Sequence, residues 1–423
     1  MFGVLWQVSS VLAAAGLLTV GTSLLSIILP LSLARADVST EMTGIVMAAY
    51  YGGLMLGARY GIAIITRTGH IRAFAGFAAI CCAAVLSHPL WVDPAPWIVL
   101  RLVSGFCLAG LFATMESWLN DSTSNQTRGR VLGVYLMTSY VSAAIGQLMV
   151  NLWDVWQVYP YLVAGLIVSL SLVPVVLTRE RAPDIAKVEP LKLTELLRIS
   201  PLAVVGTLCS GLLMGAFYGL GAVYGQLVQL DVLGISIFLS ALVLGGFLLQ
   251  FPIGKLSDVL DRRTVMAVVM AVAAALSVAG ALLPSFTHEF WAFALIAALV
   301  GGPFSVVYPL ALGQAFDYLP KERYVAASGG LLFSYAIGAT LGPVVCSFLM
   351  GQIGAVAFFG FFAAVCFLLF AFVVYRMRVR TALPAGEQEV YQAVPVNSPI
   401  AAELDPRSAP QEEEAEAPPP MAA

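Results

Sequence analysis

Charged residues are scarce in this 423-residue chain, and their scarcity excludes an ordinary soluble domain. They make up 11% of the sequence, whereas soluble domains carry about 25%. Hydrophobic residues make up 60%, and the mean hydropathy is +0.91. So few polar side chains cannot cover a surface in water. We therefore expect a protein that crosses the lipid bilayer many times.

Residues that bind metals or act as nucleophiles are also few. The three histidines, His70, His88 and His288, form no cluster with cysteines. The six cysteines lie in apolar runs without metal-ligand spacing, so we interpret them as small core residues. No paired acids and no nucleophile–base set are present. We predict no enzymatic activity, cofactor or metal, and expect no nucleic-acid partner. The cysteines are Cys81, Cys82, Cys107, Cys209, Cys346 and Cys366.

Long apolar runs recur along the chain. A hydrocarbon core about 30 Å thick needs about 20 residues of helix. The candidate spans are 8–31, 42–65, 73–92, 96–119, 131–152, 159–178, 200–226, 234–254, 264–283, 289–315, 325–349 and 353–375. The first run is too long for a signal peptide and lacks a basic n-region, so we expect it to be a span.

Lysine and arginine gather in alternate loops, and this bias sets the orientation. With the N-terminus inside, the loop cations from Arg67 to Arg380 fall on the cytoplasmic side, and the opposite short loops contain only Arg35. Cytoplasmic loops carry such an excess. We predict a multi-pass protein of the plasma (inner) membrane of a bacterium, with both termini cytoplasmic.

The longest polar interruption divides the spans six and six. We predict an N-terminal six-helix bundle (1–178), a cytoplasmic loop (179–199) and a C-terminal six-helix bundle (200–376). Residues 377–423 are rich in Pro, Ala and Glu and have almost no large apolar side chains. Because such a segment cannot offset its ordering entropy by burial, we predict a disordered acidic, Pro-rich cytoplasmic tail.

The two halves repeat each other at an offset of 196 positions in their clearest stretch. Repeated halves are typical of secondary transporters, in which the ligand site lies near the midplane between them. The matched residues are Gly133, Ser142 and Gly146-Gln147 in the fifth span, and Gly329, Gly338 and Gly342-Pro343 in the eleventh.

A loop motif after the eighth span resembles a signature of the major facilitator superfamily. The signature Gly-x-x-x-Asp-Arg-x-Gly-Arg-Arg is represented by Gly254-Lys-Leu-Ser-Asp258-Val-Leu-Asp261-Arg262-Arg263. Val259 and Asp261 depart from it. The copy after the second span keeps Arg67, Gly69 and Arg72, but has Ile62 and Thr66 in the glycine and aspartate places.

Two further motifs extend the resemblance from about residue 8 to 376. The fourth span reads Arg101-Leu-Val-Ser-Gly105-Phe-Cys-Leu-Ala-Gly110, which resembles the family's Arg-x-x-x-Gly-x-x-x-x-Gly. The fullest glycine series of the antiporter type is in the eleventh span, because Gln147 replaces its proline in the fifth. The stretches 116–147 and 342–345 are similar to the uncharacterised YcaD-like branch of this superfamily.

The resemblance implies an all-α membrane protein of about twelve transmembrane helices in two pseudo-symmetric six-helix bundles. It also implies a secondary transporter that moves a small organic solute by alternating access, and we expect proton coupling and a monomer in the lipid bilayer. A drug or metabolite efflux pump and a uniporter are the nearest alternatives. From another class, the chain could be a transport-inactive sensor or scaffold that uses its tail.

A cytoplasmic gate is predicted around Glu116. This residue follows Arg101 by fifteen positions, which is about 22 Å along a helix. Among the arginines of the adjoining loops it can form bidentate ion pairs that open and close; the alternative is a proton relay. Asp258 is expected to latch a helix N-terminus, or only to pair with Arg262. The gate and loop-motif candidates are Thr66, Arg67, Gly69, Arg72, Glu116, Arg128, Arg130, Gly254, Asp258, Arg262 and Arg263.

A cavity is expected where polar and aromatic residues interrupt the apolar spans. Arg59 is a candidate for an anionic ligand or a carboxylate partner. Arg101 is expected to face a cavity or a partner, or instead to reach the membrane surface. The other candidates are Thr22, Ser26, Tyr50, Tyr51, Gln147, Asn151, Tyr218, Tyr224, Gln250, Tyr308, Gln314 and Tyr335. Together they favour a modestly polar or amphipathic solute. The predicted hinge and packing residues are Gly105, Gly110, Gly133, Gly146, Gly329, Gly338, Gly342 and Pro343.

Overall fold

The computed structural model describes residues 8–177, 189–381, 383–396 and 403–408, and these residues form helices and connecting turns. The N-terminal half contains α2 (Ser9–Arg35), α3 (Thr40–Thr68), α4 (His70–Ser87), η1 (His88–Leu90), α5 (Pro94–Asp121), α6 (Asn125–Leu148), η2 (Met149–Leu152), α7 (Tyr159–Leu170) and α8 (Leu172–Val176).

The C-terminal half follows a short linker helix, α9 (Leu193–Ile199). It contains α10 (Pro201–Leu227), α11 (Val232–Val259), α12 (Arg262–Leu282), η3 (Leu283–Ser285), α13 (Phe290–Phe316), η4 (Lys321–Arg323), α14 (Tyr324–Ile353), α15 (Val356–Val379), η5 (Ala385–Glu387) and η7 (Pro406–Ser408).

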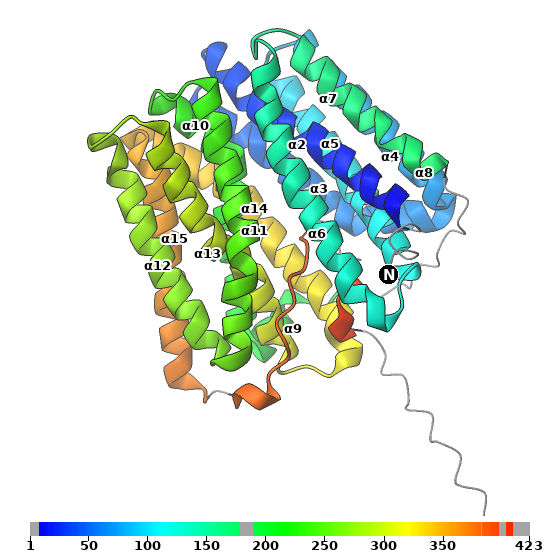
Figure 1. Cartoon of the computed structure of the whole chain (residues 1–423), viewed down its shortest axis with the longest axis vertical. Coiled ribbons are helices and arrows are strands. Elements are labelled where there is room, and N and C mark those ends of the chain that lie inside the picture. The colour runs from blue at the N-terminus through cyan, green and yellow to red at the C-terminus, as the bar shows by residue number, and fades with distance from the viewer. Residues whose placement is uncertain (1–7, 178–188, 382, 397–402, 409–423) are drawn as a thin grey trace, which may run out of the picture.

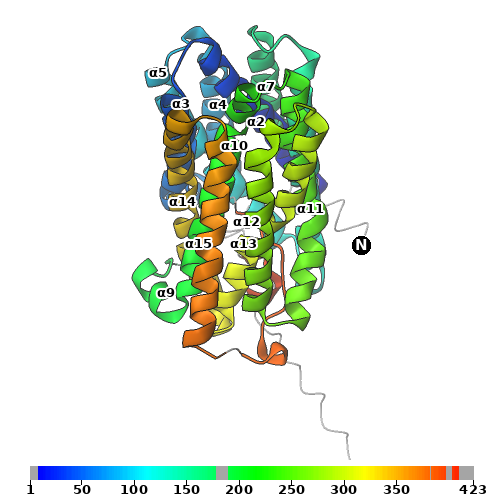
Figure 2. The same cartoon turned by 90° about the vertical axis from the view of Figure 1, so that its left-hand side faces the viewer.

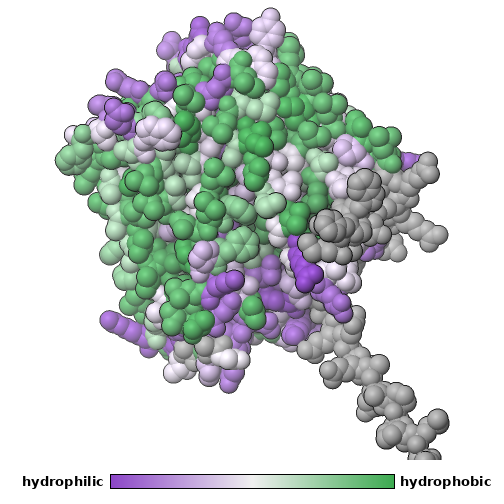
Figure 3. Space-filling model, in the orientation of Figure 1, coloured by the Kyte–Doolittle hydropathy of each residue, from purple (hydrophilic) through white to green (hydrophobic). Residues whose placement is uncertain are grey.

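Eleven helical segments of the described chain are long and apolar enough to cross a membrane. Helix α3 is also of spanning length, with 29 residues, and carries the charged residues Glu41, Arg59 and Arg67. With α3 the described segments of spanning length number twelve, in agreement with the prediction. Their lipid-facing surface is a broad apolar band between two polar ends (Figure 3).

Side-chain caps and one special glycine fix where the helices begin and end. Asp231 caps α11 through a hydrogen bond from the Gly234 amide (2.7 Å), and Asp261 caps α12 through the Arg263 amide (3.0 Å). Gly69, between α3 and α4, has φ +86°. Because this left-handed region favours glycine, the retained motif glycine has a structural reason.

The twelve segments of spanning length, of which the sixth consists of α7 and α8, form two bundles that stand side by side (Figure 1). Contacts between the bundles run mainly through α3 with α14 and α6 with α11. At the end where α3 begins, Gly44 packs against Ser347 of α14, and Asn151 Nδ2 donates to Ser236 Oγ of α11 (2.7 Å). The bundles therefore meet at this end of the molecule, which we call the closed end.

The opposite end, which we call the tail end, differs from the sequence prediction of a disordered tail. Residues 383–396 and 403–408 return between the bundles there, and α9 lies at the same end (Figures 1 and 2). Val394, Pro395 and Leu404 are buried. The prediction rested on the low apolar content of residues 377–423 as a whole. The structure differs because these few apolar residues are packed between the bundles. Residues 377–379 of the predicted tail form the end of α15. Residues 382, 397–402 and 409–423 of the predicted tail, and residues 179–188 of the predicted loop, lie outside the described residues.

Candidate functional site: a cavity between the bundles

A cavity of about 290 Å³ lies between the bundles. Both halves form its wall, through α2, α3, α4, α5 and α6 on one side and α10, α11, α13 and α14 on the other. The tail contributes Val394, Pro395 and Val396. The cavity therefore occupies the place that the repeated halves predict for a ligand site.

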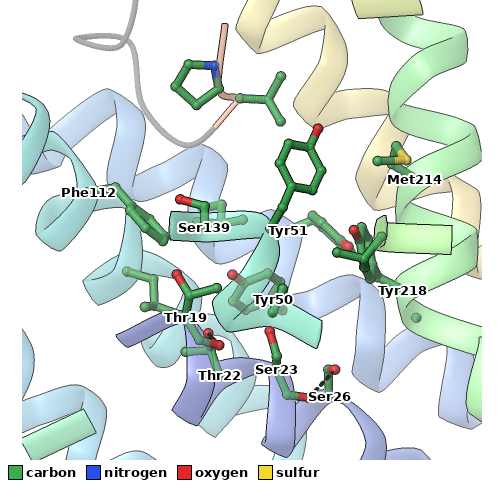
Figure 4. A pocket seen from close by; sticks show the side chains of 18 of the residues that line it. Thr19, Thr22, Ser23, Ser26, Tyr50, Tyr51, Phe112, Ser139, Met214 and Tyr218 are labelled. Atoms are coloured by element: carbon green, nitrogen blue, oxygen red, sulfur yellow. Dashed lines mark hydrogen bonds between the residues drawn. The ribbon is translucent and has the colours of Figure 1, made fainter. Parts of the chain in front are cut away.

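Hydroxyl and aromatic side chains dominate the polar part of the cavity wall (Figure 4). Such a wall offers many hydrogen-bonding groups beside flat apolar faces. The tyrosines are Tyr50, Tyr51, Tyr140, Tyr218, Tyr308 and Tyr335, the amides are Gln147 and Gln250, and the smaller hydroxyls are Thr19, Thr22, Ser23, Ser26, Ser104, Ser139, Ser210 and Ser305.

Arg101 is the one charged side chain among the described residues that line the cavity. It extends from α5 and is 6% exposed. Its guanidinium carbon lies 4.3 Å from the centroid of the Tyr50 ring, so the face of the tyrosine supports the cation. The described residues form no ion pair with Arg101, and its Nε has no hydrogen-bond partner among them. The cavity thus contains an uncompensated positive charge.

Further cavity atoms are buried without a hydrogen-bond partner in the described chain, among them Thr19 Oγ1 on α2, Ser104 Oγ on α5 and Gln147 Oε1 on α6. Ser104 follows Arg101 by one helical turn, so both face the same side of α5. Buried polar groups normally have partners. These unpaired groups of the cavity wall can hydrogen-bond to a polar ligand.

Most of the predicted cavity residues lie in the cavity wall. Tyr50, Tyr51, Arg101, Gln147, Tyr218, Gln250, Tyr308 and Tyr335 line it, together with Thr22 and Ser26. Gln314 is buried but does not line it.

Besides Gln314, three predicted cavity residues lie outside the lining of this cavity. Arg59 is exposed on the outer side of α3, with its guanidinium carbon 5.5 Å from the Tyr60 ring centroid. Asn151 belongs to η2 and joins the bundles at the closed end. Tyr224 stacks on Phe358 at a centroid distance of 4.6 Å, inside an aromatic core. Residue type alone did not reveal which side of each helix faces the cavity.

Helical spacing would have found several cavity residues that the prediction missed. Tyr140 and Ala143 precede Gln147 by seven and four positions on α6, and Ser104 follows Arg101 by three on α5. Such spacings place side chains on one helix face. Extending each predicted residue along its face therefore identifies these lining positions from sequence.

The predicted packing glycines divide into two groups. At Gly105, Gly146, Gly338 and Gly342 an added Cβ would overlap backbone atoms of a neighbouring helix, and at Gly110 it would overlap the Phe77 ring. Gly329 faces Pro190 of the linker. Pro343 packs against Gly219 of α10.

Gly133 departs from the predicted packing role. A Cβ added there would meet no atom of another element within 4 Å. No neighbouring helix approaches this point closely, and a hinge role for this glycine stays a prediction.

Glu116 is fully buried near the end of α5. Its Oε1 accepts a hydrogen bond from the Tyr135 hydroxyl of α6 (3.0 Å), and the carboxylate interacts electrostatically with Tyr308 of the other bundle. His70, also buried, lies 3.1 Å through Nε2 from the hydroxyl of Ser117, the next residue along α5. Two buried titratable side chains therefore lie in one layer of the N-terminal bundle.

The arginines predicted to surround Glu116 lie in more open surroundings. Arg67, Arg72 and Arg130 are exposed, and half-buried Arg128 interacts electrostatically with Glu403 and Asp405 of the tail. Thr66 is also exposed, and its hydroxyl donates to the Ala63 carbonyl of its own helix (3.2 Å). A ring of guanidiniums around Glu116 stays a prediction.

The loop motif after α11 is engaged by the chain's own tail. Asp258 Oδ1 accepts from the Tyr391 amide (2.6 Å), and Gly254 lies under the Tyr391 ring. Arg262 is buried and pairs through Nη1 with Asp317 Oδ2 (2.7 Å). Burial raises the pKa of the Asp317 carboxyl, and the Arg262 guanidinium opposes the rise.

Arg263 makes the remaining contacts of this motif. Its Nη1 donates to the Arg380 carbonyl at the end of α15 (2.7 Å), and its Nη2 pairs with Asp261 (3.2 Å). The motif therefore ties α11 and α12 to α15 and to the tail.

Two helical bundles around a cavity with apolar and hydroxyl-bearing side chains, and an apolar belt outside, are typical of a multi-pass membrane transport protein. The chain belongs to the Major Facilitator Superfamily, whose family model matches residues 11–245 and 204–407. It is 29% identical over 356 residues to the uncharacterized MFS-type transporter YcaD of Escherichia fergusonii, and 30% identical over 360 residues to that of Escherichia coli (strain K12 / DH10B). Each alignment covers 83% of this chain and 91% of the relative.

Solved structures share the fold at low sequence identity. The nucleoside transporter NupG has a TM-score of 0.69 and 12% identity, over 89% of this chain and 100% of its own. A bacterial homolog of the human lysosomal transporter Spinster, in an inward-facing and unoccupied conformation, has a TM-score of 0.66 and 15% identity, over 96% of this chain and 98% of its own. These likenesses concern the arrangement of the helices alone.

Proposed function

We propose that this protein is a proton-linked transporter that moves a small organic anion across the bacterial inner membrane by alternating access. The proposal places both termini in the cytoplasm and takes the monomer as the working unit. The observation that carries it is Arg101, a buried cation in the cavity wall with no ion-pair partner among the described residues. Efflux of the same solute would use the same cavity.

A single negative charge on the solute follows from the charges of the cavity wall. A cation inside a membrane protein costs about 2.5–3.5 kcal/mol on insertion scales and normally faces a partner or a cavity. A carboxylate or similar group could form a charge-assisted hydrogen bond with Arg101. Since Arg101 is the only charge on the described wall, a second negative group on the solute would lack a partner.

An amphipathic body for this anion follows from the rest of the wall. Six tyrosines offer flat apolar faces with hydroxyl groups at their ends. The cavity volume of about 290 Å³ is at the lower end of the range for small-molecule sites, about 300–1,000 Å³. We infer a compact metabolite with an apolar or aromatic portion and one anionic group.

Alternating access is supported by the unequal ends of the cavity. The two bundles touch at the closed end, where Gly44 packs against Ser347 and Asn151 hydrogen-bonds to Ser236. At the tail end the segment 394–396 lies between the bundles. With the termini inside, this arrangement is an inward-facing state, and rocking the bundles about the cavity would open the other side.

Proton coupling is proposed to use Glu116. It is fully buried, bonds to Tyr135 within its bundle, and interacts electrostatically with Tyr308 in the cavity wall of the other bundle. A carboxylate bonded within one bundle, whose charge acts on a residue of the other, can respond to their relative movement. Its protonation would therefore be linked to the conformation of the transporter.

A ligand-stability screen on the purified protein tests the proposal. A ligand that binds only the folded state raises Tm with its concentration. Small amphipathic monoanions should raise Tm, while their neutral amides and dianionic analogues of equal size should not. Equal stabilisation by the neutral amides would contradict the anion site.

A further inference from the structure

At the tail end, hydrogen bonds and buried contacts hold the C-terminal segment against both bundles. We propose that this segment, residues 383–396 and 403–408, is an internal ligand that plugs the cavity and restrains transport. The proposal deepens the proposed function and rests on it, because a plug has meaning only for a cavity that opens. We call the described residues of this segment the plug.

The first anchor of the plug is Tyr391, on the loop motif. Its ring covers Gly254 so closely that a Cβ at that glycine would collide with it. Its backbone amide donates to Asp258 Oδ1 (2.6 Å). The plug thus uses two residues of the motif that the sequence assigned to the gate.

The second anchor is Glu389, which contacts three residues of the C-terminal bundle. Its amide donates to Asp317 Oδ1 (2.9 Å), its carbonyl accepts from Arg262 Nη2, and its Oε1 accepts from the Tyr324 hydroxyl (2.9 Å). Asp317 and Arg262 are themselves ion-paired. The C-terminal bundle therefore binds both the backbone and the side chain of Glu389. These bonds fix the position of the plug along the bundle.

The third anchor joins the N-terminal bundle. Glu403 Oε2 accepts from Asn120 Nδ2 of α5 (3.2 Å), and Leu404 is buried in the core cluster of that bundle. Arg407 pairs with buried Asp405, donates to the Val390 carbonyl (3.1 Å) and lies 4.8 Å from the Phe316 ring centroid of α13. The plug therefore holds both bundles at once.

Between these anchors the plug forms part of the cavity wall. Val394, Pro395 and Val396 line the cavity, and Ala393 and Val394 are buried in the core clusters of the N-terminal and C-terminal bundles respectively. A solute entering from the tail end must displace these residues. Closure of the tail end, as alternating access requires, must also release the segment that lies between the bundles.

The plug also competes with the predicted latch. Asp258 was expected to bond to a helix N-terminus when the tail end closes. While Asp258 accepts the Tyr391 amide, that lone pair is not available to the latch. Docking of the plug should hold the present conformation, and its release should permit the next step of the cycle.

Accessibility of a cavity cysteine tests the plug without knowledge of the solute. Ser139 lines the cavity from α6 (Figure 4). The Ser139→Cys variant would be reacted in nanodiscs with a hydrophilic maleimide, and labelling of the parent chain subtracted. Deleting residues 384–423 should speed labelling several-fold. A synthetic peptide of residues 383–408, added to the truncated protein, should slow it again.

Matched variants keep this test decisive. Tyr391→Ala should speed labelling in the full chain, whereas Tyr375→Ala, an exposed tyrosine on α15, should not. Thr68→Cys, exposed at the end of α3, should label equally with and without the tail. Equal labelling of Ser139→Cys in full-length, truncated and Tyr391→Ala proteins would overturn the plug. Because this readout needs no solute, that result would leave the transport proposal standing.

Discussion

At Arg101 a full positive charge lies in a wall that contains no other charge among the described residues. Replacing it by glutamine removes the charge and keeps hydrogen-bonding capacity. Hydrogen bonds to charged groups contribute about 1.5–3 kcal/mol, so Arg101→Gln should weaken anion binding about 10- to 100-fold. Arg59→Gln, on the outer side of α3, should bind as the parent does. Ligand-dependent Tm shifts measure both constants, and equal weakening in the two variants would refute the role of Arg101.

Glu116 presents a second prediction at the scale of single residues. Glutamine can still accept the Tyr135 hydrogen bond but cannot take up and release a proton. Glu116→Gln should therefore fold and bind the solute while losing accumulation driven by a pH gradient. Counterflow exchange in proteoliposomes, which needs no net proton movement, should persist. If gradient-driven accumulation also persists, Glu116 belongs to the gate and not to the proton path.

At the scale of helices, the close packing of α5 against α3 depends on a motif glycine. At Gly105 of α5 a Cβ would overlap the carbonyl oxygen of Tyr50 on α3. Because backbone cannot yield as a flexible side chain does, Gly105→Ala should cost about 1–3 kcal/mol of unfolding free energy through overpacking. Gly133→Ala, on α6 with open space around it, is the matched control. Equal Tm values for the two variants would show that α3 and α5 are less tightly packed than described.

Elements were largely predictable from sequence because the bilayer imposes both length and hydropathy. Each apolar run corresponds to one long helix, except 159–178, whose described part forms α7 and α8, and the repeated halves implied the two bundles. The plug was not predictable, because composition treats residues 377–423 as one polar segment. Its docking depends on a few separated residues, such as Tyr391 and Leu404, and on backbone hydrogen bonds to Asp258 and Asp317. Those partners are brought together only by the fold.

The cavity was only partly predictable, for a related reason. Residue type identified Arg101 and the tyrosines that line it, but it also selected Arg59 and Tyr224, which face outward and into an aromatic core. Which side of a helix faces the cavity depends on how the bundles pack. The near-uniform hydropathy of these spans gives little indication of that side. Helical spacing from a secure residue such as Arg101 recovers part of the missing information.

Across the whole molecule, the cavity, the closed end and the plug form one mechanical system. The bundles touch through Gly44 and Ser347 at one end and share the plug at the other. Rocking must break the first contact and release the second. The solute site at Arg101 lies between the closed end and the plug. Solute binding there can favour one conformation only if the solute has a higher affinity for that conformation than for the other.

Flux through reconstituted protein tests this account most directly. Proteoliposomes with an imposed pH gradient would be supplied with a radiolabelled monoanion that raises Tm. The account predicts saturable uptake above empty liposomes, retained in Arg59→Gln and lost in Arg101→Gln. The account would be contradicted if Arg101→Gln took up the monoanion at the parent rate. It would also be contradicted if the protein truncated by deletion of residues 384–423 showed no uptake.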